Sequence, residues 1–199
     1  MVVLLCLPFI WTVQRTVHAT DAPVAGTAAE NIGFGIEELT TLLTRETAAS
    51  ANFREQQFRH VLKEPLRREG ELYFEPPALF EKRVLAPVSE TYRLEGETLS
   101  IVLPGRRTRQ VSLRNQPLLG GLLLGFQAVV SGRLDRLEPA FVVTVSGTAE
   151  DWQLVLRPNQ EEIATYIDVI QVTGRGSEPL RFEITERNGD RTVTDIEPK

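Results

Sequence analysis

The segment from Glu69 to Gly96 constrains the fold of this chain more than any other. Its apolar residues Leu72 and Phe74 alternate with glutamate and tyrosine, which is the two-residue period of a strand that buries one face. Prolines at positions 76, 77 and 87 interrupt the run, because proline lacks the N–H that a strand ladder needs. The segment therefore predicts antiparallel strands with a shared apolar face, and such a face needs a covering layer.

Further alternating segments extend this sheet to ten or eleven strands. We expect strands at 51–61, 80–85, 88–94, up to about 103, 106–113, 141–145, 152–156, 166–172, 180–186 and 191–196. Loops are expected at 63–68 and 174–179, a polar break at 159–164, and a tight hairpin at Asn188-Gly189. The predicted fold class is α+β, mainly β: a curved antiparallel sheet, or incomplete barrel, with helices over its concave face.

Two segments predict the covering helices. Residues 36–43 repeat apolar side chains at spacings of three and four, the pattern of an amphipathic helix. Gln116–Val130 has a broad apolar face and begins with Pro117, which suits a first helical turn. Its three glycines weaken the helix and would let it approach the sheet closely. Two interpretations stay open for this helix: a loosely held cover over a lipid cavity, or a well-packed core helix.

The first residues predict export from the cytoplasm. The apolar run from Val2 to Trp11 is too short to span a membrane, and Val17-His18-Ala19 supplies small residues for cleavage after Ala19. No lysine or arginine precedes this run, so a buried N-terminal strand is the alternative. We expect a signal peptide at residues 1–19, a linker at residues 20–34 and a single domain at residues 35–197.

The composition argues against several classes of protein. The net charge is −5, and no basic cluster is long enough to follow a phosphate backbone, so we expect no nucleic-acid partner. Cys6 and His18 lie inside the predicted signal, which leaves His60 as the one histidine of the domain and argues against a metal site. No nucleophile motif or phosphate loop stands out. We expect no catalytic residues and no cofactor, and we interpret His60 as a surface residue.

Several short motifs occur in an order that resembles a known family. They are Gly70-x-Leu72-x-Phe74, a proline turn, Leu79 to Lys82, Pro87-x-x-Glu90 and Leu94-x-Gly96-x-x-Leu99, with Phe53 and Glu55–Gln57 upstream and Trp152–Pro158 and Gly189–Arg191 downstream. Together they resemble the outer-membrane lipoprotein carrier family, in its LolA-like branch, over residues 35–197.

This resemblance implies a periplasmic carrier of a Gram-negative bacterium. Such a carrier binds the acyl chains of lipoproteins, or of other lipidated cargo, and moves them from the inner toward the outer membrane. The implied partners are that lipid, an inner-membrane donor and an outer-membrane acceptor, and the carrier would be a monomer. We expect its hydrophobic cavity between sheet and helix to be lined by Phe53, Leu72, Phe74, Phe80, Leu99, Ile101, Leu119, Leu122, Leu123 and Phe126.

The chain departs from the family at two positions. Pro76 stands where the family has an arginine that ties the sheet to its helices, and Lys82 stands where an aromatic residue is expected. A divergent paralogue for a glycolipid or another acylated envelope product fits these differences. Two further alternatives stay open: an adaptor module of an envelope complex with a filled core, or an accessory that presents an acylated substrate to an enzyme.

Overall fold

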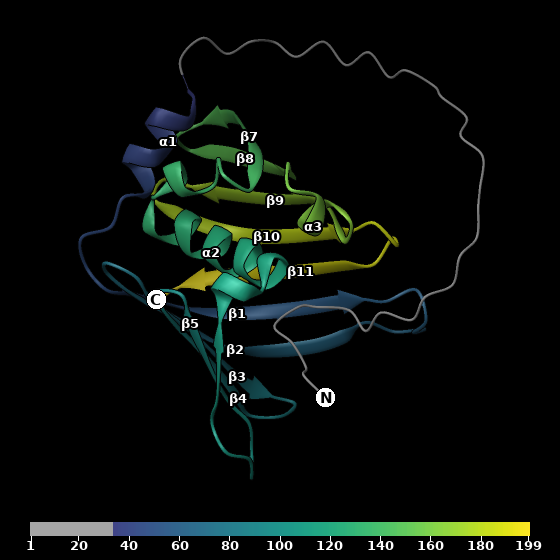
Figure 1. The fold of residues 1–199 in the computed structure, drawn as a ribbon. Coiled ribbons are helices and arrows are strands. Elements are labelled where there is room, and N and C mark those ends of the chain that lie inside the picture. Colours follow the sequence, from purple (N-terminus) through teal and green to yellow (C-terminus); the bar gives the residue numbers. More distant parts are fainter. Residues whose placement is uncertain (1–33) are drawn as a thin grey trace, which may run out of the picture.

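The computed structural model describes residues 34–199 (Figure 1). The predicted signal peptide, residues 1–19, and the predicted linker, residues 20–34, lie outside this range apart from Phe34. Within it, eleven strands form one open antiparallel sheet in the order β6-β5-β4-β3-β2-β1-β11-β10-β9-β8-β7. The sheet does not close on itself, because β6 and β7 are its two edges. This confirms the predicted incomplete barrel.

The bounds of the elements follow the predicted segments closely. The strands are β1 Ala49–Phe58, β2 Leu66–Glu75, β3 Leu79–Ala86, β4 Glu90–Glu95, β5 Thr98–Val102, β6 Arg109–Ser112, β7 Phe141–Thr148, β8 Asp151–Pro158, β9 Ile167–Arg175, β10 Glu178–Glu186 and β11 Arg191–Pro198. The helices are α1 Ile36–Leu43, α2 Pro117–Ser131 and α3 Glu161–Ala164, with the 3₁₀ turns η1 Leu113–Asn115 and η2 Leu134–Arg136.

The order of the strands explains where the helices lie. Strands that are neighbours in the chain pair with each other, and β1 pairs with β11, so both ends of the folded domain meet in the middle of the sheet. The chain must then pass from edge strand β6 to edge strand β7, and the segment between them carries α2. Figure 1 shows α2 lying across the concave face, with α1 beside the β7 edge.

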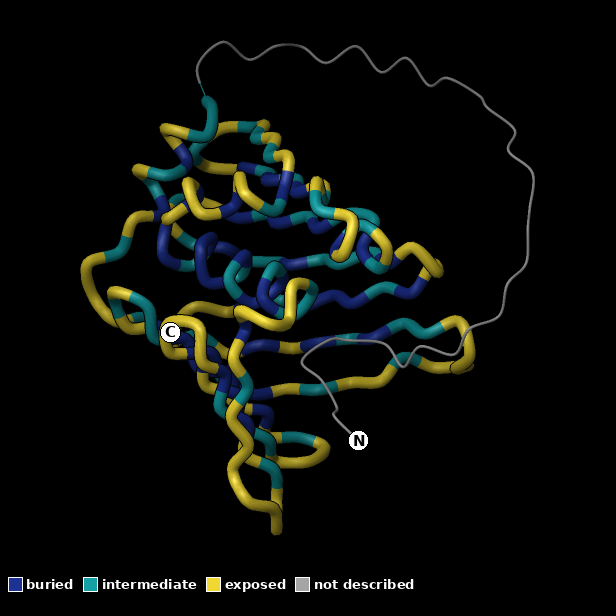
Figure 2. Tube along the Cα trace, viewed as in Figure 1, coloured by how far each residue is buried: buried dark blue, intermediate teal, exposed yellow. Residues whose placement is uncertain are grey.

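Alternating burial fixes the inner face of the sheet. In β8, Trp152, Leu154 and Leu156 are all buried, while the residues between them are more exposed. Figure 2 shows buried positions running across the central strands beneath α2 and exposed positions gathered at the turns. A two-residue period with one apolar side is the pattern read from the sequence, and the core forms between that side and the helices.

Three sequence expectations were wrong in detail. Strand β2 begins at Leu66, inside the loop expected at 63–68, and the polar break at 159–164 contains the one-turn helix α3. The loop expected at 174–179 is mostly strand, because Arg175 pairs with Glu178. Gly174 occupies a strand position there, where a Cβ would come within 2.1 Å of the Trp152 ring. This glycine therefore makes room for the indole rather than marking a loop.

Candidate functional site

Helix α2 covers the middle of the concave face with an almost wholly apolar surface. It begins at Pro117, whose missing N–H costs nothing in a first turn, and ends before Gly132, which adopts a left-handed conformation with φ of 69°. Its buried residues include Leu122, Leu123 and Val129. A helix that is apolar on so many sides needs contact with protein or ligand around most of its circumference.

Phe126 of α2 joins the two halves of the sheet. Its ring centroid lies 4.9 Å from that of Phe80 in β3 and 4.1 Å from that of Phe182 in β10. Three strands, β2, β1 and β11, separate β3 from β10 in the sheet order. The curvature of the sheet therefore forms a trough between Phe80 and Phe182, and Phe126 inserts into it from above.

A small cavity remains beside the Phe126 ring. Its volume is about 60 Å³, and it is lined by Leu72, Phe80, Leu122, Leu123, Phe126, Phe182 and Ile184, with Glu55, Lys82 and Thr194 as its polar residues. A second cavity of about 50 Å³ shares Leu72 and Phe80 with the first and lies nearer Arg45 and Val130. Sites for organic ligands typically measure hundreds of Å³. A ligand of that size therefore fits here only if α2 and Phe126 move outward.

One polar side chain ties α2 to the sheet. Gln127, which is 4% exposed, donates a hydrogen bond from its amide nitrogen to the carbonyl oxygen of Ala78. Ala78 lies in the turn between β2 and β3, directly after Pro76 and Pro77. The family's arginine is missing from this turn as expected, yet a hydrogen bond from the helix side connects the same two elements.

A comparison with protein families gives a match over most of this chain. The profile of the family described as outer membrane lipoprotein carrier protein, LolA-like, matches residues 25–196. The chain belongs to the LolA-like family. No curated protein matches this LolA-like chain.

Several solved structures resemble this LolA-like chain at low identity. A LolA superfamily protein from Nitrosomonas europaea is 10% identical with a TM-score of 0.42, and the match covers 81% of this chain and 89% of that one. A putative outer membrane lipoprotein-sorting protein domain from Vibrio parahaemolyticus is 12% identical with a TM-score of 0.43, over 81% and 89%. MucB, solved in complex with MucA, is 12% identical with a TM-score of 0.36, over 82% and 54%.

The structure brings together about half of the residues predicted for the cavity of this LolA-like domain. Leu72, Phe80, Leu122, Leu123 and Phe126 line the larger cavity, and Phe74 lines the smaller one. Phe53, Leu99 and Ile101 are buried in the core and line neither cavity, and Leu119 packs against the core while partly exposed. As ligand-binding residues, all ten remain a prediction.

Sequence reasoning missed the contribution of β10 and of three polar residues. The alternation of Phe182 with Ile184 marks both as inward-facing and could have placed them opposite α2. Lys82 stood out only as a departure from the family, and Glu55 and Thr194 carried no signal, because polar and charged residues are normally assigned to the outer face of a sheet.

The glycines of α2 face other helical turns more than the sheet. A Cβ at Gly121 would lie 2.4 Å from Cδ1 of Ile163 in α3, and one at Gly120 would lie 3.1 Å from the carbonyl oxygen of Leu113. At Gly125 the nearest atom, in Phe141, would be 3.5 Å away. The expectation that glycines fit α2 against the sheet is therefore wrong for Gly120 and Gly121.

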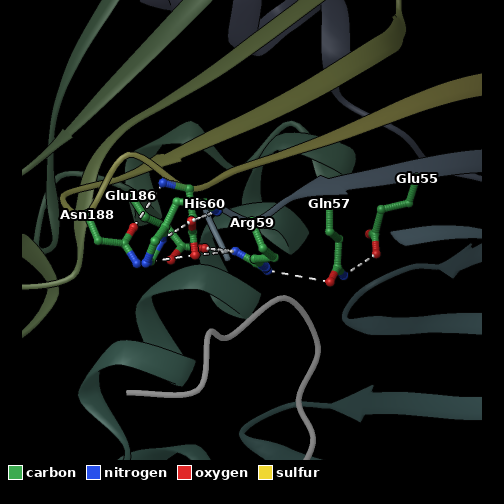
Figure 3. A network of polar contacts seen from close by, with 7 residues as sticks. Glu55, Gln57, Arg59, His60, Glu186 and Asn188 are labelled. Atoms are coloured by element: carbon green, nitrogen blue, oxygen red, sulfur yellow. Dashed lines mark hydrogen bonds and ion pairs between the residues drawn. The ribbon is translucent and has the colours of Figure 1, made fainter. Parts of the chain in front are cut away.

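A row of polar side chains runs along β1 from the cavity to the edge of the inner face (Figure 3). Glu55 accepts hydrogen bonds from Lys82 Nζ at 2.5 Å and from Thr194 Oγ1 at 3.2 Å. Gln57 Nε2 donates to the other Glu55 oxygen at 2.8 Å, and Arg59 donates to Gln57 Oε1 at 3.4 Å. Lys82 Nζ also lies 4.7 Å from the centre of the Phe53 ring.

The outer end of this row is an acidic cluster around Arg59. The guanidinium of Arg59 lies 2.5 Å from Glu186 Oε1 and 3.6 Å from Asp190 Oδ2. Burial raises the pKa of the Glu186 carboxyl, and Arg59 offsets part of that rise. Burial alone would raise the pKa of Asp190, but hydrogen bonds from the backbone N–H and ring of His60 bring it below its ordinary value.

His60 lies at the surface as expected, with 62% of its side chain exposed. Among residues 34–199, no group of three or more histidine, cysteine, aspartate or glutamate side chains is arranged to hold a metal ion. In the same part of the chain, no helix is long and apolar enough to cross a membrane.

Proposed function

We propose that this chain is a periplasmic carrier that binds the acyl chains of lipoproteins or other lipidated cargo beneath α2. The observation that carries this proposal is the Phe126 ring of α2, inserted into the apolar trough between Phe80 and Phe182. The CH₂ groups of an acyl chain can take the place of this ring in the trough, because they are apolar as the ring is. Membership of the LolA-like family supports the proposal.

The energies of the contacts indicate what kind of ligand can open the site. Exposing a phenylalanine costs about 1.5–3 kcal/mol, each aromatic contact about 0.5–1.5 kcal/mol, and a hydrogen bond such as that of Gln127 about 1 kcal/mol. Burying one CH₂ group returns about 0.8 kcal/mol. A ligand must therefore bury on the order of ten CH₂ groups before binding becomes favourable, since association carries its own entropic cost. Long acyl chains satisfy this requirement and short ones do not.

The remaining parts of the proposal come from the family. Transfer from the inner toward the outer membrane requires a donor protein and an acceptor protein, and we propose both as partners of this chain. The bound cargo itself is the lipid, so the carrier works without catalytic residues or a cofactor. An adaptor with a permanently filled core is the main competing function, because it would use the same fold without accepting a ligand.

Native mass spectrometry of the purified full chain tests acyl binding directly. The protein is incubated with acylglycerols whose chains contain 6, 10, 14 or 18 carbon atoms, on the order of the threshold above. The proposal predicts one-to-one adducts that appear only with the longer chains. A folded protein that forms no adduct at any chain length would contradict the carrier function and favour the adaptor.

A further inference from the structure

A buried ion pair forms part of the cavity wall beside Phe126. The side chains of Glu55 and Lys82 are 0% and 8% exposed, and their charged atoms lie 2.5 Å apart. The hydroxyl of Thr194 donates to the same Glu55 oxygen. All three residues line the cavity together with seven apolar side chains. The cavity is therefore apolar except for one compact polar spot.

Stability is a weak explanation for this pair. Removing two charges from water is costly, and replacing a buried ion pair with apolar residues of similar volume is often neutral or stabilising. The two residues also come from different parts of the sheet: Glu55 lies on β1 opposite Thr194, while Lys82 lies on β3 opposite Leu72. A polar group placed at such cost in an otherwise apolar cavity is typical of a site that orients a ligand.

We propose that Glu55, Lys82 and Thr194 recognise the carbonyl group through which an acyl chain is attached to its cargo, as an ester or an amide. This inference rests on the proposed carrier function. The Lys82 ammonium carries three N–H donors, so it can donate to a carbonyl oxygen while it keeps its bond to Glu55. The single O–H of Thr194 donates to Glu55 and thereby holds the carboxylate that positions Lys82. The pair as a whole is neutral, and a free carboxylate would compete with Glu55 for Lys82. A neutral linkage therefore fits better than a free fatty acid.

The polar row on β1 gives the ligand a direction. Figure 3 shows Gln57 and Arg59 continuing the row from Glu55, and Arg59 directly follows Phe58, the last residue of β1. A carbonyl held at Lys82 leaves the hydrocarbon chain in the trough of Phe80 and Phe182. The linkage then faces the side of the cavity from which Gln57 and Arg59 continue, and both of these side chains are largely buried and bonded within the protein. The site thus distinguishes the two ends of an acylated molecule.

Two ligands that differ only in the carbonyl isolate its contribution. They are a 1-monoacylglycerol and the 1-O-alkylglycerol ether of the same chain length, and the free fatty acid serves as a third. Each displaces a fluorescent apolar dye from the full-length protein. Because a hydrogen bond to a charged group is stronger than one between neutral groups, we expect the ester to bind about tenfold more tightly than the ether. We expect the free acid to bind more weakly than the ester.

The decisive variant combines Glu55→Leu with Lys82→Met, which removes both charges and keeps similar volumes. It should bind ester and ether about equally, with the affinity for the ether changed by less than about twofold. The control combines Arg54→Met with Glu197→Gln, an exposed pair at 2.6 Å on the same strand β1 and its neighbour β11. This control should keep the preference for the ester. If the double variant does not fold, Thr194→Val retains the ion pair and should lower that preference.

The possible results separate this inference from the carrier function. A wild-type protein that binds none of the three ligands would overturn both. Wild-type binding with no preference for the ester, or an unchanged preference in the folded double variant or in Thr194→Val, would overturn the carbonyl site and leave the carrier function standing. If the free fatty acid binds more tightly than the ester and the ether, the carbonyl site is also overturned, because a neutral linkage is then not the preferred ligand.

Discussion

The side-chain amide of Gln127 in α2 donates a hydrogen bond to the carbonyl oxygen of Ala78 in the turn between β2 and β3. This bond joins the covering helix to the part of the sheet where the resemblance to LolA-like proteins leads one to expect an arginine. Pro76 occupies that place, so no side chain of the turn can reach upward as an arginine would. The helix supplies the contact instead, and under the proposed carrier function the strength of this contact should govern how readily α2 opens.

Replacing Gln127 with methionine should loosen α2 while preserving its volume. The substitution leaves the Ala78 carbonyl without this donor, so we expect a loss of about 1 kcal/mol in the free energy of unfolding. Hydrogen exchange should become faster along α2 and remain unchanged in β8 and β9. Gln110→Met, at an exposed position of β6, is the matched control. If the rate of hydrogen exchange along α2 is the same in Gln127→Met, in Gln110→Met and in the wild type, this bond does not hold the helix.

The glycines of α2 should respond differently to alanine. At Gly125 a new Cβ meets only ordinary contacts, so Gly125→Ala should stabilise the protein by up to about 1 kcal/mol through helix propensity. At Gly121 the new Cβ would overlap Cδ1 of Ile163, which is fully buried, so Gly121→Ala should destabilise. Adding Ile163→Val removes that Cδ1 atom and should recover the loss. Urea unfolding midpoints measure all three, and equal effects of the two glycine substitutions would contradict this packing.

The strands could be predicted from the sequence because the patterns that mark them are local. Alternation around Leu72 and Phe74 required no knowledge of distant residues, and the Asn188-Gly189 pair marked the hairpin between β10 and β11 by its own backbone preference. Apolar spacing and Pro117 predicted α2 to within one residue at each end. These elements are determined by short-range rules, and those rules suffice for the class of fold.

The polar part of the site could not be predicted from the sequence because its contacts join residues far apart in the chain. Glu55 meets Thr194 only because β1 pairs with β11, a contact between the two ends of the folded domain. Lys82 reaches Glu55 across the intervening strand β2. No local pattern in the sequence determines how these strands are aligned. A charged residue at an inward-facing position of a strand therefore could not be matched with its partner. For Phe182 the inward direction follows from its local alternation with Ile184, but its contact with Phe126, 56 positions earlier in the chain, does not.

The acidic cluster around Arg59 should give stability a pH dependence of two opposite signs. The pKa of Glu186 is raised in the folded state above its ordinary 4.5, so the folded state binds more protons and loses stability as the pH rises through that folded pKa. The pKa of Asp190 is lowered below 3.8, so its contribution is present above that pH and is lost as the pH falls through the folded pKa.

Two variants separate these contributions in denaturant titrations at a series of pH values. Relative to Glu186→Gln, the wild type should become progressively less stable as the pH rises above 4.5, its ordinary pKa. Relative to Asp190→Asn, the wild type should become less stable as the pH falls below 3.8, its ordinary pKa. Differences that stay constant with pH would show that neither carboxyl is perturbed by this cluster.

Phe126→Glu tests whether the space beneath α2 is a binding cavity or a packed core. The substitution places a carboxylate between Phe80 and Phe182, where desolvation costs several kcal/mol unless the charge reaches water or becomes protonated. If α2 can open, water enters and the domain remains folded, but the charge occupies the path of an acyl chain. If the core is permanently filled, the protein unfolds or loses most of its stability. Val142→Glu, at a position of β7 that is 58% exposed, is the control.

The most direct measurement is the binding of a fluorescent acyl probe to wild type, Phe126→Glu and Val142→Glu, with thermal melting recorded on the same samples. We predict that Phe126→Glu melts cooperatively and binds the probe at least about tenfold more weakly than the other two proteins, because the new charge must be desolvated by the chain. A folded Phe126→Glu protein that binds the probe as well as wild type would contradict the account of an acyl-binding site beneath α2.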